Sequence, residues 1–95
     1  MVRPKKGRRI GCRPAFSCFK PNGVPLSQLD SVSLQADELE AIRLADLLNL
    51  NHQQAADEMA VSRQTFGNIV ARARHKVAQS LVEGMALTID PERLS

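Results

Sequence analysis

The stretch that decides the fold runs from Leu39 to Val77, and at its centre is the break Met59-Ala60-Val61-Ser62-Arg63. Before the break, apolar residues recur at i, i+1 and i+4, and after it at i, i+3, i+4, i+7 and i+11; both are helical spacings. They are Ala55, Ala56 and Met59, and then Phe66, Ile69, Val70, Ala73 and Val77. Two helices joined by so few residues cannot lie antiparallel and must cross steeply. The stretch therefore predicts a helix-turn-helix.

Polar residues at the two helix starts support this division. Ser62 has a hydroxyl placed to accept a hydrogen bond from the Thr65 amide, which predicts an N-cap. Asn51, followed three residues later by Gln54, has the spacing of a capping box. We therefore expect helices over residues 52–59 and 63–83.

A further long helix is predicted over residues 35–48, where Ala41, Leu44, Ala45 and Leu48 form an apolar stripe. Acidic residues lie near its start, where the helix dipole favours them, and we interpret them as charges on a solvated helix face. They are Asp37, Glu38 and Glu40. This helix should pack across the two that follow and complete a three-helix core.

The two ends of the chain have a different pattern. Residues 1–25 are predicted to be a basic N-terminal arm and an extended segment, with a short strand near 15–19, and residues 26–84 to be the helix-turn-helix domain. At the start of that domain, Ser27 could cap a short helical turn, or residues 32–34 could form an extended link. Residues 85–95 are predicted to be a short C-terminal strand or tail, because residues 85–90 alternate between apolar and polar. This strand could pair with the N-terminal segment within one chain or between two copies.

Charge is distributed unevenly along the 95 residues, whose net charge is +3. Residues 1–20 hold seven basic side chains and no acid, whereas the other 75 residues hold six basic and ten acidic ones. A basic arm on an acidic body is typical of a protein that binds a polyanion. The alternative is a tail that is merely solvated.

Several classes of protein are not expected. No apolar run approaches the roughly 18 to 20 residues of a membrane span and no signal peptide is evident, so we expect a cytoplasmic, nucleoid-associated protein without membrane contact. No Ser/His/Asp set, glycine-rich phosphate loop or pair of carboxylates at helical spacing in an apolar setting is evident, so no enzyme and no cofactor are predicted. Cys12 and Cys18 are weak candidates for metal ligands, because no second pair accompanies them. Reduced thiols are the expected alternative.

With its apolar face buried, the last helix would present residues suited to a DNA groove. Those predicted to read bases are Arg63, Gln64, Thr65 and Asn68. Those predicted to contact the DNA backbone are Ser62, Arg72, Arg74 and Lys76, together with Arg3, Lys5, Lys6, Arg8 and Arg9 of the arm. Gly67 in mid-helix indicates close approach to DNA or to the preceding helix, or a tolerated defect.

The residues of this stretch carry a resemblance. Residues 37–77, above all Val-Ser-Arg-Gln-Thr-Phe at 61–66, resemble the helix-turn-helix of sigma-factor region four. The whole chain is similar to a family of small uncharacterised prokaryotic proteins that combine this unit with Arg-Pro-Lys-Lys…Arg-Arg, here at 3–9, and Phe-Lys-Pro-x-Gly-x-Pro-Leu, here at 19–26. The resemblance implies a DNA-binding protein and supplies no target. One departure is Ala60, where many helix-turn-helices carry glycine.

The expected protein is therefore mainly α-helical, with a sigma region four-like three-helix core, a basic N-terminal arm and short strands at both ends. The leading hypothesis is a sequence-specific double-stranded DNA-binding transcriptional regulator, with residues 63–83 in the major groove and the arm on the backbone or minor groove. A homodimer on a symmetric site is a further hypothesis. The alternative is a protein-interaction module that docks on the transcription machinery, RNA polymerase included, with only non-specific affinity for nucleic acid.

Overall fold

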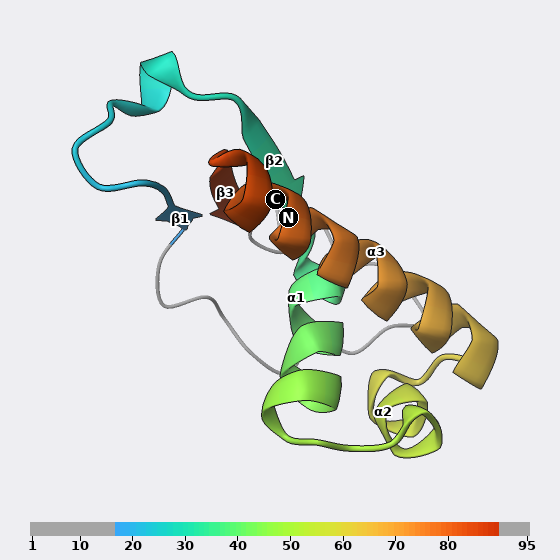
Figure 1. Ribbon diagram of the computed structural model, residues 1–95. Coiled ribbons are helices and arrows are strands. Elements are labelled where there is room, and N and C mark those ends of the chain that lie inside the picture. The colour runs from blue at the N-terminus through green and yellow to red at the C-terminus, as the bar shows by residue number, and fades with distance from the viewer. Residues whose placement is uncertain (1–16, 90–95) are drawn as a thin grey trace, which may run out of the picture.

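The computed structural model describes residues 17–89, in which three α-helices pack beside a small sheet (Figure 1). The helices are α1 (Ala36–Ile42), continued by a π-helical turn η2 (Arg43–Leu47), α2 (His52–Met59) and α3 (Arg63–Glu83). The strands are β1 (Cys18–Phe19), β2 (Ser31–Leu34) and β3 (Ala86–Ile89), with a 3₁₀ turn η1 (Leu26–Gln28) between the first two. The prediction of a mainly helical protein with a few short strands is confirmed.

The starts of α2 and α3 have the predicted capping bonds. The Asn51 side chain accepts from the Gln54 amide at 2.8 Å, and the Gln54 side chain accepts from the Asn51 amide at 3.0 Å. The Ser62 hydroxyl accepts from the Thr65 amide at 3.0 Å. These bonds satisfy amides that have no partner inside a helix, so they fix where each helix begins.

The link between α2 and α3 turns at Ala60, whose φ of 58° and ψ of 42° are left-handed. This conformation costs an L-residue other than glycine roughly 1–2 kcal/mol. Ala60 is the residue that the sequence has where many helix-turn-helices carry glycine. Val61 follows and packs against the helical core.

The first helix differs from its prediction in its last turn. The Leu48 amide donates to the Arg43 carbonyl five residues back, at 2.9 Å, and Asn49 then takes a φ of 60°. The wider turn rotates the chain out of register with the apolar stripe, so the prediction that Leu48 is buried is wrong: Leu47 and Leu48 are 71% and 48% exposed. Leu50 packs against the core instead.

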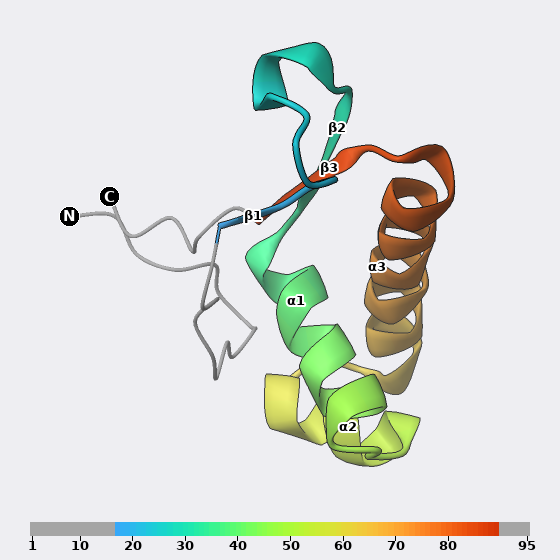
Figure 2. The same ribbon diagram turned by 60° about the vertical axis from the view of Figure 1, so that its left-hand side comes forward.

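Two buried clusters lie along α3. The larger joins α1, η2, α2 and the N-terminal half of α3, and consists of Ala41, Leu44, Ala55, Ala56, Met59, Phe66, Ile69 and Val70. The smaller joins α3 to the sheet through Ala73, Leu34 and Ile89. The helix α3 is therefore held to α2 at one end and to the sheet at the other, as Figure 2 shows.

The sheet has the strand order β1-β3-β2. The strand β3 is antiparallel to β1, with Cys18 opposite Thr88, and parallel to β2, with Leu34 opposite Ile89. The predicted C-terminal strand is thus the central strand, and its pairing with the N-terminal segment occurs within one chain. The part of the predicted first strand before residue 17, and residues 90–95, lie outside the described residues.

Of the two alternatives at the start of the helical domain, the extended link is confirmed, because residues 32–34 belong to β2. The short turn also forms, but Ser27 does not cap it. The turn begins after Pro25, whose carbonyl accepts from the Gln28 amide at 2.9 Å.

Candidate nucleic-acid interface

The face of α3 opposite the core is open to solvent. Residues three or four apart on a helix share one face, and four exposed side chains with this spacing form what we call the polar stripe of α3: Gln64, Asn68, Ala71 and His75. Gly67 lies beside the stripe and is half-buried. The prediction that Gln64 and Asn68 point outward is confirmed, whereas the sequence analysis did not single out Ala71 and His75.

Three of the predicted base-reading residues have no internal partner. Within residues 17–89, the side chains of Arg63, Gln64 and Asn68 make no hydrogen bond or ion pair, and all three are exposed. Their donors and acceptors are available to a ligand.

The other two residues at the start of α3 are engaged in the cap. The Ser62 hydroxyl donates to the Thr65 hydroxyl at 2.9 Å and accepts from the Thr65 amide. Thr65 is half-buried. The predicted contact of Ser62 with the DNA backbone therefore has to coexist with its capping role.

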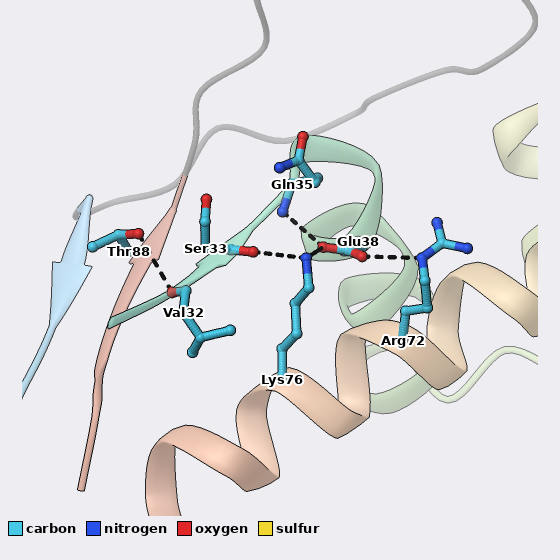
Figure 3. A network of polar contacts seen from close by, with 7 residues as sticks. All are labelled: Val32, Ser33, Gln35, Glu38, Arg72, Lys76 and Thr88. Carbon is cyan, nitrogen blue, oxygen red and sulfur yellow. Dashed lines mark hydrogen bonds and ion pairs between the residues drawn. The ribbon is translucent and has the colours of Figure 1, made fainter. Parts of the chain in front are cut away.

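The first cationic flank of the stripe is built on a buried carboxylate, Glu38 of α1, which is 1% exposed. One Glu38 oxygen accepts from the Lys76 ammonium and from the Gln35 amide, both at 2.8 Å, and the other accepts from Arg72 Nε at 3.3 Å. Lys76 also donates to the Ser33 carbonyl of β2 at 2.7 Å. We call these five residues the Glu38 cluster (Figure 3).

The prediction of a solvated acidic face at the start of the first helix is wrong. Asp37, Glu38 and Glu40 are all buried. The helix α1 follows β2 and packs against α3, and Glu38 points toward Arg72 and Lys76 of α3 (Figure 3). Glu40 pairs with Arg43 through two bonds of 2.8 and 2.9 Å. A buried carboxylate requires such partners.

Glu38 remains charged in this setting. Burial by itself would raise the pKa of Glu38, but hydrogen bonds from Lys76, the Gln35 amide and Arg72, together with the charge of Lys76, hold that pKa below its ordinary value. At neutral pH the cluster thus contains one anion and two cations.

The second flank is an exposed pair on the other side of α3. Arg74 donates to both oxygens of Asp46 in η2, at 2.8 and 3.1 Å, and both side chains are about half exposed. The hydrogen bond from Arg74 lowers the pKa of Asp46. Because two residues turn an α-helix by about 200°, Arg72 and Arg74 lie on opposite flanks of the polar stripe.

Few local features of the sequence indicate these acidic partners. Gln35 and Glu38 have the spacing of a capping box, which could have placed the Glu38 side chain at the helix start. No local pattern connects Glu38 to Arg72 or Asp46 to Arg74.

The remaining predicted site residues fall elsewhere. Arg3, Lys5, Lys6, Arg8, Arg9 and Cys12 lie outside the described residues. Cys18 lies on β1 and is half-buried. In the part of the chain that the structure describes, no group of three or more His, Cys, Asp or Glu residues could hold a metal ion. No helix there has the length and apolar character needed to cross a membrane.

The fold and this surface define a small, mainly helical protein whose longest helix presents a polar stripe between two arginines held by acids. The chain belongs to the family described as "Protein of unknown function DUF134", which matches residues 1–94. The expected membership in a family of small uncharacterised proteins is thus confirmed.

Several bacterial relatives, each called a UPF0251 protein, are similar over most of the chain. One from Vibrio vulnificus strain YJ016 is 63% identical over 89 residues, which cover 94% of this chain and 89% of the relative. One from Vibrio parahaemolyticus is 62% identical over 92 residues, covering 97% and 96%. One from Pelotomaculum thermopropionicum is 52% identical over 89 residues, covering 94% and 67%. No solved structure matches the chain.

Proposed function

We propose that the protein is a sequence-specific double-stranded DNA-binding transcriptional regulator. In this proposal α2 and α3 form a helix-turn-helix like that of sigma-factor region four, and α3 lies in the major groove. The observation that carries the proposal is the polar stripe of α3, with unpartnered amides at its centre and an arginine on each flank.

The dimensions of the groove suit this arrangement. The major groove is about 12 Å wide and admits an α-helix with its side chains, about 10–12 Å across. A phosphate strand borders each side of the groove, so a helix in it needs cations on both flanks. Arg72 supplies one flank and Arg74, with Arg63, the other.

The centre of the stripe has the chemistry of base readout. Gln and Asn amides can pair bidentately with adenine, and Arg with guanine. Gln64 and Asn68 lie in the first two turns of α3, and in a recognition helix these turns reach the base edges. The methyl group of Ala71, one turn further, suits contact with a thymine methyl.

Gly67 supports the same placement. A Cβ added to Gly67 would meet the His52 ring nitrogen Nδ1 at 3.9 Å, an ordinary van der Waals contact. Packing against α2 therefore does not require glycine. Close approach of α3 to the bases would explain the glycine, because any side chain at this position would lie between the helix backbone and the bases.

The basic arm completes the proposal. Residues 1–20 carry seven basic side chains, and in residues 21–95 acids outnumber bases ten to six. The arm would therefore supply much of the phosphate neutralisation that binding requires, on the backbone or in the minor groove. A single α3 reads few base pairs, so a homodimer on a symmetric site is part of the proposal.

The test is selection from a randomised duplex pool at near-physiological salt, with sequencing of what is retained. We expect the wild-type protein to enrich a motif that the Gln64→Ala/Asn68→Ala variant does not. The matched control is Asn22→Ala/Gln28→Ala, which removes one exposed Asn and one exposed Gln from the segment between β1 and β2. If the Gln64→Ala/Asn68→Ala variant enriches the same motif, the proposal is wrong.

A second candidate function is docking on a protein of the transcription machinery, such as RNA polymerase. The observation that favours it is the exposed pair Leu47 and Leu48 at the corner between η2 and α2. Comigration with purified RNA polymerase in gel filtration, lost in Leu47→Ser/Leu48→Ser and retained in Gln64→Ala/Asn68→Ala, would support this function in place of the first.

A further inference from the structure

The two arginines on the flanks of α3 are not free in solvent. Arg72 is paired with Glu38 of α1, and Arg74 is paired with Asp46 of η2. We propose that these carboxylates, Glu38 and Asp46, limit the affinity for DNA: they hold Arg72 and Arg74 in the free protein, and DNA phosphates have to compete for both arginines when α3 enters the groove. The proposal rests on the proposed function, since it assumes that α3 enters a DNA groove.

The two cations of the Glu38 cluster are not equivalent. Lys76 contacts Glu38 at 2.8 Å, donates a second bond of 2.7 Å to the Ser33 carbonyl, and has a side chain only 25% exposed. Arg72 makes one contact of 3.3 Å with Glu38, and its side chain is 54% exposed. Lys76 is therefore a fixed part of the fold, whereas Arg72 can turn outward.

The departure of Arg72 leaves no buried charge without a partner. Glu38 keeps the Lys76 ammonium and the Gln35 amide on its other oxygen. If Arg72 were the last cation on Glu38, its departure would leave a buried charge without a partner, and that would be costly. Because Lys76 stays, a DNA phosphate can take Arg72 from Glu38 while the cluster remains intact.

The pair on the opposite flank can exchange in the same way. Asp46 and Arg74 are both about half exposed, so water can solvate Asp46 once Arg74 has moved to a phosphate. Exposed pairs of this kind contribute little to stability. Each flank thus has one arginine that can pass from a carboxylate to a phosphate.

Paired arginines limit the affinity for DNA because binding depends on the number of phosphates that are neutralised. While Arg72 and Arg74 stay on their carboxylates, they add little to the attraction of DNA in an arbitrary register, and the half-exposed Asp46 repels it. At the cognate site, base contacts of the polar stripe hold the helix deep in the groove, where phosphates compete for both arginines. The affinity for the cognate site is lowered as well, because each pair has to be broken there.

The experiment measures affinity, by fluorescence anisotropy over a series of NaCl concentrations, for two 24-base-pair probes: the duplex most enriched by the wild-type protein and a scrambled duplex of the same composition. The variants are Asp46→Asn and Glu38→Gln. The control is Glu58→Gln, which removes an exposed acid of α2 that makes no ion pair with an arginine in residues 17–89.

For Asp46→Asn we expect tighter binding to both duplexes, by up to about fivefold at 0.15 M salt, because Arg74 no longer has to leave a carboxylate to reach a phosphate. Glu38→Gln should act in the same direction through Arg72. Glu58→Gln should leave both affinities nearly unchanged.

A second pair of variants keeps the proposal testable if Glu38→Gln unfolds. Arg72→Met should weaken binding to the enriched duplex and leave the melting temperature near that of the wild type, whereas Lys76→Met should lower the melting temperature. The proposal is overturned if Asp46→Asn leaves both affinities unchanged, as the control does. That result would leave the proposed function standing, whereas a wild-type protein that enriches no sequence would overturn both.

Discussion

Replacement of Gly67 by alanine is expected to raise the free energy of unfolding by about 0.5–1 kcal/mol, the amount by which glycine weakens a helix interior. Gly67 lies in the second turn of α3, and its φ is not in the left-handed region. The new methyl group would meet His52 Nδ1 at 3.9 Å, so the substitution adds a contact without a clash. No opposing steric cost is expected.

The assay is urea unfolding followed by far-ultraviolet circular dichroism, because the chain has no Trp or Tyr to serve as a fluorescent probe. The expected change corresponds to a rise of roughly 2–8 °C in melting temperature for a domain of this size. The control is Gly84→Ala. Gly84 ends α3 with a φ of 69°, so alanine there should lower stability, by about 1 kcal/mol.

A loss of stability in Gly67→Ala would refute this expectation. It would mean that the added methyl group lies closer to His52 of α2 than the 3.9 Å separation from Nδ1. The same variant also separates stability from function. If α3 enters the groove at Gly67, the more stable protein should bind its enriched duplex more weakly. Unchanged affinity would show that the glycine has no part in DNA contact.

Three further perturbations test other parts of the structure. Ala60→Gly should raise the unfolding free energy by up to about 1 kcal/mol in urea, because glycine adopts the left-handed φ of 58° without steric cost and Ala60 is exposed. Acidification below pH 4.5, the ordinary pKa of Glu38, should lower the wild-type stability, because the unfolded state then binds a proton more readily than the folded one. Glu38→Gln should lose less stability than the wild type over the same pH interval, and an equal loss would show that Glu38 is not the group responsible. Met59→Ala should lower the unfolding free energy by about 2–5 kcal/mol in thermal unfolding, since Met59 is fully buried and the cavity cannot close completely.

The helices could be predicted from the sequence where their signals are local. The caps at Asn51 and Ser62 each involve a residue three positions later, and the apolar face of α3 repeats within a few turns. These signals gave the bounds of α2 and α3 and the outward direction of Gln64 and Asn68. The π-helical turn at Arg43–Leu47 has no comparable signal, so its effect on Leu48 was missed.

The ion pairs of the candidate interface could not be predicted in the same way. Arg72 and Glu38 are 34 residues apart, Arg74 and Asp46 are 28 apart, and the Lys76 bond to Ser33 spans 43 residues. Such contacts depend on the crossing of α1 and α3 and on the position of β2, which no periodic pattern contains. The basic residues of α3 could be recognised in the sequence as candidates for the interface, but the residues that they pair with could not. Ala71 was missed for a different reason, because a lone alanine suits a helix core and a helix surface equally.

The Glu38 cluster joins α1, α3 and β2, which explains why one carboxylate can serve both the fold and the proposed interface. Within the cluster, Lys76 ties α3 to the Ser33 carbonyl of β2, next to the buried Leu34. Arg72 lies one turn nearer the start of α3, beside the polar stripe, where its side chain is half exposed. Arg72 and Lys76 therefore have different roles although both pair with Glu38. Loss of Lys76 would disturb the joint between sheet and helices, whereas loss of Arg72 would remove only the cation that the proposed DNA contact uses.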